Sequence, residues 1–138
     1  MASLGATFKT EMVSSLLTYA PLYALIGNRL YALRAAQNPT TPYVVWQTVS
    51  AGSQHAHSGP TGMEEQRIQF SIFSATSASC EAIRDAIKDR FDGFKGTISG
   101  LVRCESCFFD NEIDIDPELA TNLKQKVIDF RFMVKLIS

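Results

Sequence analysis

The two histidines of the chain stand two residues apart, at His55 and His57. On an extended segment, residues two apart point the same way, so this pair could share a metal ion. A stable metal site needs three or four ligands, and the nearest acids, Glu64 and Glu65, lie beyond a Gly-Pro-Thr-Gly segment. We therefore interpret the histidines as polar residues at the tip of a hairpin loop, with a pH-sensitive contact as the lesser alternative.

A second candidate site is the C-x-x-C formed by Cys104 and Cys107. Redox pairs of this kind sit at a helix N-terminus, where the thiol pKa is lowered. Here the motif lies in an expected strand, where residues three apart face opposite sides of a sheet. Cys80 is expected on the core face of a helix, and an odd number of cysteines fits a reducing compartment. The pattern favours buried packing over thiol chemistry.

An acidic run follows from Asp110 to Glu118. Its acids alternate with other residues, and they are Asp110, Glu112, Asp114, Asp116 and Glu118. On an extended segment they would share one face and could bind Mg²⁺ or Ca²⁺ loosely, but the run lacks the glycine and the spacing of a calcium loop. We favour a solvated edge, or a surface that meets basic residues of a neighbour. The candidate basic partners are Arg29, Arg34 and Arg67.

Enzyme motifs are scarce. The sequence has no G-x-S-x-G, no P-loop and no G-x-G-x-x-G, so neither a serine hydrolase nor a nucleotide-binding enzyme is indicated, and no catalytic residue, metal or cofactor is predicted. The alternative from the enzyme class is a small metal- or thiol-dependent enzyme that uses His55 and His57, or Cys104 and Cys107.

Composition fits one globular domain spanning residues 1–138. The chain is 46% hydrophobic and 20% charged, which is enough apolar material for a core without disulfides or metal. A net charge of −1 argues against a protein that grips a phosphate backbone. The longest apolar stretch, Tyr19 to Ile26, is far shorter than the ~20 residues that a bilayer requires. With no secretory signal at the start, we expect assembly in the cytoplasm and no membrane partner.

Hydrophobic periodicity predicts elements of both types. Phe8, Met12 and Leu16 recur at helical spacing, and Ile128 to Leu136 alternates as a strand does. The remaining expected elements are a short helix at Leu22–Ile26, strands at Arg29–Leu33, Tyr43–Val49, Ile68–Ile72 and Leu101–Phe109, a loop at Ser50–Gly62 and a helix at Ser77–Phe91. This order predicts an α+β fold: a mostly antiparallel sheet with a long β-hairpin and helices packed on one face.

Three short words occur in a fixed order along the chain: Arg29-Leu30-Tyr31, Pro42-Tyr43-Val44-Val45 and Gly59-Pro60-Thr61-Gly62. The chain then closes on the strand KVIDFRFMVKL. From about Glu11 to Leu136 it resembles the tail terminator, or tail completion, proteins of long-tailed bacteriophages and prophages. The His-x-His and the C-x-x-C depart from the family pattern.

The resemblance implies a non-enzymatic virion protein at the head-proximal end of the tail. Such subunits form a ring, typically a hexamer, that stops polymerisation of the tail tube and docks to the head connector proteins. Genome DNA passes through the bore without specific binding. A head-completion or connector adaptor protein is the nearest alternative, because it would also be small, α+β and ring-forming.

Three surfaces are expected to meet other subunits. The first is the hairpin at Ser50–Glu65, with Gln54, His55, His57, Glu64 and Glu65. The second is the acidic segment with its basic partners Arg29, Arg34 and Arg67. The third is the polar face of the helix at Ser77–Phe91.

Overall fold

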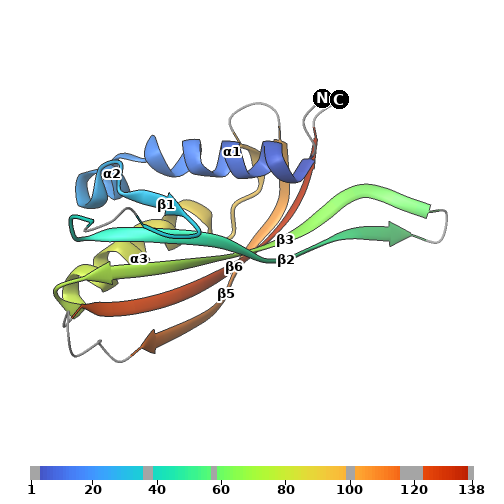
Figure 1. The fold of residues 1–138 in the computed structure, drawn as a ribbon. Coiled ribbons are helices and arrows are strands. Elements are labelled where there is room, and N and C mark those ends of the chain that lie inside the picture. The colour runs from blue at the N-terminus through green and yellow to red at the C-terminus, as the bar shows by residue number, and fades with distance from the viewer. Residues whose placement is uncertain (1–3, 36–38, 57–58, 99–101, 116–122, 137–138) are drawn as a thin grey trace.

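The computed structural model describes residues 4–35, 39–56, 59–98, 102–115 and 123–136. Its elements are α1 (Leu4–Leu17), α2 (Ala20–Ile26), β1 (Leu30–Ala32), β2 (Tyr43–Ala56), β3 (Gly59–Ser74), α3 (Ser77–Phe91), β4 (Gly96–Ile98), β5 (Val102–Ile115) and β6 (Lys124–Leu136). Figure 1 shows a twisted sheet with α1 and α3 beside it and a β2–β3 hairpin that projects from the body. The α+β class predicted from sequence is confirmed.

The six strands form one sheet in the order β1-β2-β3-β6-β5-β4. The four long strands, β2, β3, β6 and β5, are antiparallel to their neighbours. At one end of the sheet the short β1 runs parallel to β2, and at the other end the short β4 pairs antiparallel with β5. The mostly antiparallel sheet is therefore confirmed, with one parallel pair that the sequence reading did not include.

The core lies between the helices and one face of the sheet. On β6, Ile128, Phe130, Phe132 and Val134 are fully buried, and the residues between them point to the opposite face. Phe130 is surrounded by aromatic rings, with Phe91 of α3 6.1 Å away between ring centroids. The period-two pattern of the sequence thus separates a helix-covered face from an uncovered face, defined here as the face that carries Arg67, Gln69, Asp129 and Arg131.

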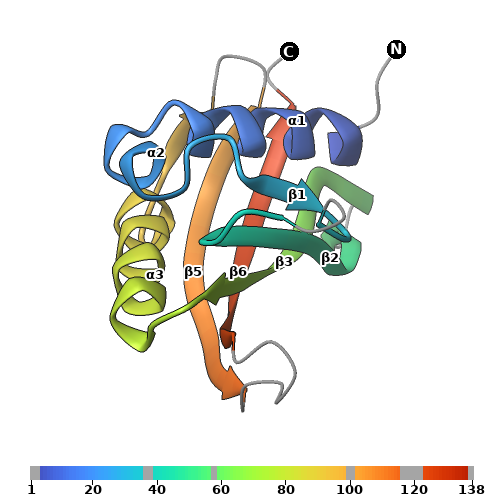
Figure 2. The same ribbon diagram turned by 60° about the vertical axis from the view of Figure 1, so that its left-hand side comes forward.

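Local sequence signals explain where α3 begins and ends. The Thr76 hydroxyl accepts a hydrogen bond from the Ser79 backbone N–H, which satisfies one of the free donors of the first turn. Lys88 and Arg90 lie in the last turn, where positive charge is favourable. Figure 2 shows α3 alongside β5, with α1 crossing above the strands.

Two boundaries predicted from sequence are wrong. The segment expected as a loop, Ser50–Gly62, is mostly strand: β2 continues to Ala56 and β3 starts at Gly59. The strand expected to end at Phe109 continues to Ile115. The first segment is poor in the large apolar residues that mark a strand in sequence, and in the second the acids outnumber Ile113 and Ile115. Both are extended because a neighbouring strand supplies backbone hydrogen bonds.

Two predictions about which side chains share a face of the sheet are also wrong. The reason is that β5 has a bulge between Cys104 and Ser106 and another between Phe109 and Asn111. The first extra residue shifts the alternation, so Cys104 and Cys107 face the same side and both are buried. The three described acids of the run do not share one face either, and Asp116 and Glu118 lie outside the described residues. Glu112 and Asp114 contact residues on the helix-covered side, whereas Asp110 contacts Arg67 on the uncovered face.

Candidate assembly surfaces

The most prominent surface feature is the arm, defined as the part of the β2–β3 hairpin beyond Ser53 and Glu64. The β2–β3 ladder continues to Ala56 and Gly59, whereas β6 pairs with β3 only as far as Glu64. The arm is therefore a two-stranded ribbon outside the body of the sheet (Figure 1). A two-stranded hairpin is marginally stable in water by itself, so contact with another surface would stabilise it.

The predicted hairpin residues occupy two different settings. Gln54 and His55 belong to β2 within the arm, while His57 lies outside the described residues. At the base of the arm, the Glu64 carboxylate accepts a hydrogen bond from the Gln66 amide at 2.8 Å. Glu65 lies 3.6 Å from Arg131 across the sheet. The use of these residues in assembly stays a prediction.

An ion-pair network crosses the uncovered face at the base of the arm. Arg67 binds Asp110 at 2.8 Å, and Arg131 lies 3.8 Å from the same carboxylate. Asp129 lies 3.9 Å from Arg67 and is 8% exposed. Arg67 and Asp110 were predicted as partners across an interface, and here they are partners within one subunit. Their charges are largely compensated before any second subunit arrives.

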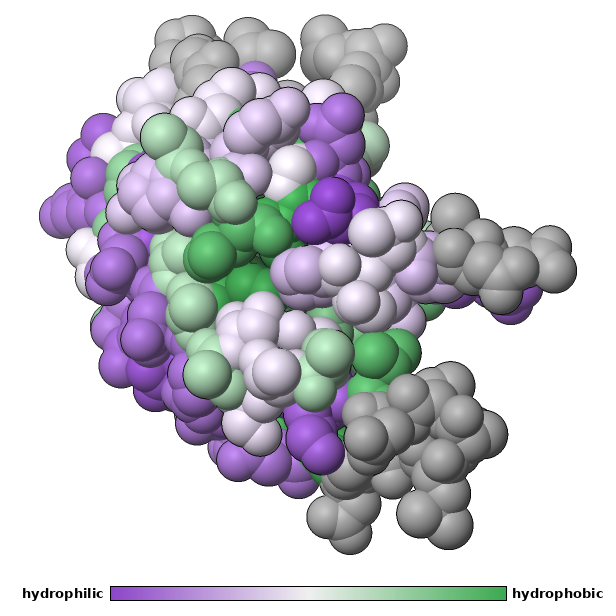
Figure 3. Space-filling model, turned by 90° about the vertical axis from the view of Figure 1, so that its left-hand side faces the viewer, coloured by the Kyte–Doolittle hydropathy of each residue, from purple (hydrophilic) through white to green (hydrophobic). Residues whose placement is uncertain are grey.

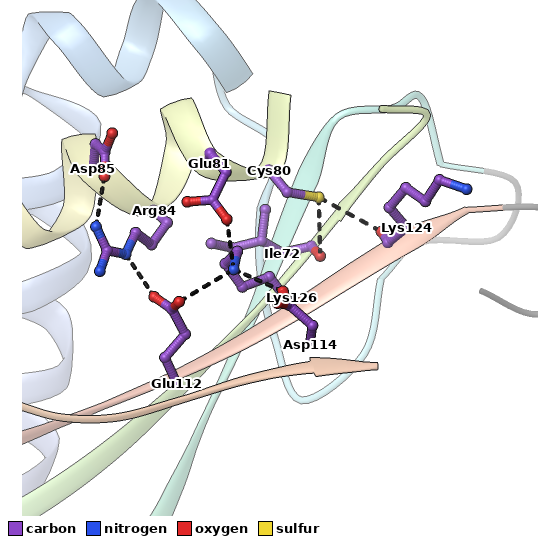
Figure 4. Close-up of polar contacts among 9 residues, drawn as sticks. All are labelled: Ile72, Cys80, Glu81, Arg84, Asp85, Glu112, Asp114, Lys124 and Lys126. Atoms are coloured by element: carbon purple, nitrogen blue, oxygen red, sulfur yellow. Dashed lines mark hydrogen bonds and ion pairs between the residues drawn. The ribbon is translucent and has the colours of Figure 1, made fainter. Parts of the chain in front are cut away.

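A second ionic cluster lies on the helix-covered side, where Lys126 meets three carboxylates (Figure 4). The Lys126 side chain is 3% exposed, and its ammonium lies 2.6 Å from Asp114, 2.7 Å from Glu81 and 3.3 Å from Glu112. Arg84 of α3 binds Glu112 from the other side at 2.6 Å. The cluster links the C-terminal half of β5, through Glu112 and Asp114, to β6 and to α3.

Electrostatics in this cluster stabilise the charged forms. Burial raises the pKa of Glu112, but hydrogen bonds from Arg84 and Lys126 outweigh it and leave the pKa below its ordinary value. Burial lowers the pKa of Lys126, and hydrogen bonds to Asp114, Glu81 and Glu112 outweigh it in the same way, so the pKa is raised. A lysine buried among three acids gives no signal in the sequence, because Lys126 merely stands in an alternating strand.

The three cysteines are buried, Cys80 on α3 and Cys104 and Cys107 on β5. Burial raises the pKa of Cys104 to about 11 and also raises the pKa of Cys107. The thiolate is the reactive form, so both thiols are poor nucleophiles at neutral pH. This chemistry does not support the thiol enzyme. Within the described part of the chain, no group of three or more His, Cys, Asp or Glu residues is arranged to hold a metal ion.

The remaining predicted arginines lie near β1. Arg29 donates from Nε to the Pro42 carbonyl at 2.8 Å and so ties β1 to the start of β2. Arg34 is exposed and lines a shallow groove on the uncovered face together with Tyr43 and Phe73, whose rings stack at 4.9 Å. Leu33, at the edge of this groove, is 74% exposed and has a positive φ of 67°. An exposed leucine with a positive φ is unusual, and it makes the groove a candidate contact surface.

The end of the molecule at which α2 lies carries an apolar hollow. Figure 3 shows hydrophobic side chains gathered in a hollow at the centre of this face, with hydrophilic side chains toward its rim. The sequence of α2, APLYALI, has no charged residue, and Tyr23 is 49% exposed. In the described residues, no helix has the length and hydropathy needed to cross a bilayer.

A projecting arm, an uncovered sheet face and compensated surface charges together describe a subunit suited to assembly. The sequence model of one family, described as tail completion protein gp17, matches residues 10–135. The chain therefore belongs to the tail completion protein gp17 family, which confirms the resemblance drawn from the sequence. By this match it is classed as a tail completion protein.

A solved structure gives the same class of fold. A chain from the virion of a native gene transfer agent particle superimposes with a TM-score of 0.78 over 97% of this chain and 98% of its own length. The two sequences are 19% identical, so this similarity concerns the fold. No curated protein matches the sequence.

Proposed function

We propose that the protein forms a ring, a hexamer, that caps the completed tail tube, ends its polymerisation and provides the docking surface for the head connector proteins. The family match over residues 10–135 carries this proposal. Its position would be the head-proximal end of the tail, after assembly in the host cytoplasm. Residues 1–138 would act as one domain in this ring.

The arm supports the proposal physically. A ring needs unlike surfaces on each subunit that meet head to tail, and a projecting hairpin can reach a neighbour or the tube. Because an isolated two-stranded hairpin is only marginally stable, packing against a second protein would order and stabilise it. Gln54, His55 and Glu65 would lie in or next to this contact.

The charge balance supports the passage of DNA through the bore. Thirteen basic and fourteen acidic residues leave a net charge of −1. The charges on the uncovered face are paired with one another, as Arg67 and Asp110 show. A wall of compensated charge has little electrostatic attraction for a phosphate backbone, so DNA would traverse the ring without being held.

Deleting the gene and imaging the particles by electron microscopy tests the proposal. We expect overlong tails that are not joined to heads, and restoration of normal particles when the gene is supplied in trans. Tails of normal length, joined to heads, would overturn the proposal. Co-sedimentation of the purified protein with tail tubes, and not with portal-side adaptors, would separate the tail role from that of a head-completion adaptor.

A further inference from the structure

Both ends of the sheet leave long stretches of strand without a neighbour. β1 pairs only with Val44–Trp46, so within the part of the chain that the structure describes the outer edge of β2 is open from Gln47 onward. β4 pairs only with Val102–Cys104. Further along β5, the Gly93 N–H donates a hydrogen bond to the Cys107 carbonyl, and the Asp92 carboxylate accepts one from the Phe109 N–H. Among the described residues, the outer edge of β5 from Asp110 to Ile115 has no backbone partner. Open edges of this length are sites for pairing with another strand.

We propose that the open edge of β2 in one subunit pairs with the open edge of β5 in the next, so that the sheets of successive subunits are continuous around the ring. The inference rests on the ring assembly proposed above and adds the surfaces that form its interface. The occupant of each edge is thus a second copy of this chain.

The directions of the strands favour this occupant. The four long strands alternate in direction across the sheet, so β2 and β5, its outermost long strands, run antiparallel to each other. Rotation about a ring axis leaves strand directions unchanged with respect to that axis. A neighbouring copy therefore brings β5 to β2 in the antiparallel sense, which is the more stable pairing. Head-to-tail contact between unlike edges is also the type of interface that closes a ring.

The two open edges lie at different positions along the strand direction, and the offset between them has the size of the strand shift that a closed sheet requires. Following the register across the sheet, Gln47 lies level with Asn111, through Gln69 and Asp129. Pairing the open edges then requires a shift of about five residues per subunit, or ~16 Å at 3.3 Å per residue. The four long strands of one subunit span four inter-strand spacings of ~4.8 Å each. A shift of ~16 Å over this width tilts the strands by ~40° from the ring axis, within the 35–45° tilt that is typical of closed sheets.

The side chains along the two edges are compatible. Ile113 and Ile115 on β5 are 51% and 42% exposed, and Val49 on β2 is 49% exposed, so apolar surface is available on both sides. No acidic residue occurs from Tyr43 to Met63, so the acids of β5 meet no like charge there. The β5 acids are also paired within their own subunit, which removes the repulsion that commonly protects an open edge.

Disulfide cross-linking of rings assembled on tail tubes tests the inference. The double variants Val49→Cys/Ile113→Cys and Val49→Cys/Ile115→Cys place thiols on the two edges in neighbouring registers, and the native cysteines are buried. Cysteines form a disulfide only when their Cα atoms lie within ~7 Å. We expect at least one variant to give a ladder of covalent oligomers on a denaturing gel. The control is Val49→Cys/Asp89→Cys, with the second thiol exposed on α3, which should stay monomeric.

Hydrogen exchange on the unmodified protein supplies an independent measurement. Among residues 47–51 and 110–115, the amides that point away from β3 and β6 should exchange at least ~10-fold more slowly in tube-bound rings than in the free protein. Rings that form without cross-links in either variant and without this protection would overturn the edge pairing and leave the ring proposal standing. Wild-type protein that forms no ring on tube ends would overturn both.

Discussion

Replacing Lys126 by methionine removes the central charge of the ionic cluster and keeps most of the aliphatic packing. The Lys126 ammonium contacts Asp114, Glu81 and Glu112, and its side chain is 3% exposed. Glu81 and Asp114 are 51% and 76% exposed, so water recovers much of their solvation when the lysine is lost. The cost should therefore fall below the 3–5 kcal/mol that is typical when one partner of a buried pair is removed.

The magnitude follows from the contacts. Three partly exposed pairs contribute ~0.2–1 kcal/mol each, and the repulsion among three newly uncompensated carboxylates adds to their loss. We expect the free energy of unfolding to fall by about 2 kcal/mol, which for a chain of this size lowers Tm by ~6–8 °C. Urea and thermal denaturation, followed by circular dichroism, measure both quantities.

A matched control separates the cluster from a general effect of lost positive charge. Lys135 is 46% exposed and has one ion pair, to Glu105 at 3.4 Å, so Lys135→Met should change the free energy of unfolding by less than ~0.5 kcal/mol. If Lys126→Met were as stable as Lys135→Met, the cluster would not fasten β5 as described.

Four further outcomes are expected. The pKa of Glu112 is lowered on folding, so its ionised form stabilises the protein above the unfolded pKa of ~4.3, and this contribution is lost as pH falls. Lys126→Met removes part of the cause of this shift. Urea titrations should therefore show a shallower loss of stability below pH ~5 in Lys126→Met than in wild type. Cys104 and Cys107 should resist a thiol reagent at pH 8 in the native protein and react after denaturation, and rapid native labelling would contradict their burial. Phe130→Ala should cost ~3–5 kcal/mol in denaturant unfolding, because its ring packs against several others in the core. Replacing residues 54–63 by Asn-Gly keeps the Ser53–Glu64 pair and should leave Tm within a few degrees of wild type, yet fail to restore normal tails in the deletion strain.

Much of the fold follows from periodicity. The helical spacing of Phe8, Met12 and Leu16 and the alternation from Ile128 to Leu136 each indicate an element that must bury one face. α3 was placed correctly at Ser77–Phe91, because an N-cap threonine and an amphipathic pattern agree there. The resemblance to tail completion proteins supplied the family, which neither composition nor spacing could do.

The candidate surfaces were harder to predict, because they depend on which strands meet. The length of the arm comes from backbone pairing between segments of Gly, Ser and His that have no strand signal of their own. The bulges of β5 insert one residue each, and no pattern in the sequence marks them. A period-two reading without the bulges assigns Cys104 and Cys107 to opposite faces, and the same reading gives Asp110, Glu112 and Asp114 one face.

The positions of the bulges also determine where β5 can gain or lose a residue without moving its other side chains to the opposite face of the sheet. The first extra residue is Glu105, which binds Arg103 at 2.9 Å, and the second is Asp110, which binds Arg67. Deleting either residue would make the ladder regular and leave every other side chain of β5 on its present side, at the cost of surface ion pairs. Deleting Phe108 instead, which has a single partner in the ladder, would move Phe109 to the uncovered face and Asp110 into the core. Insertions and deletions among relatives of this chain should therefore collect at the two bulges and be rare between them.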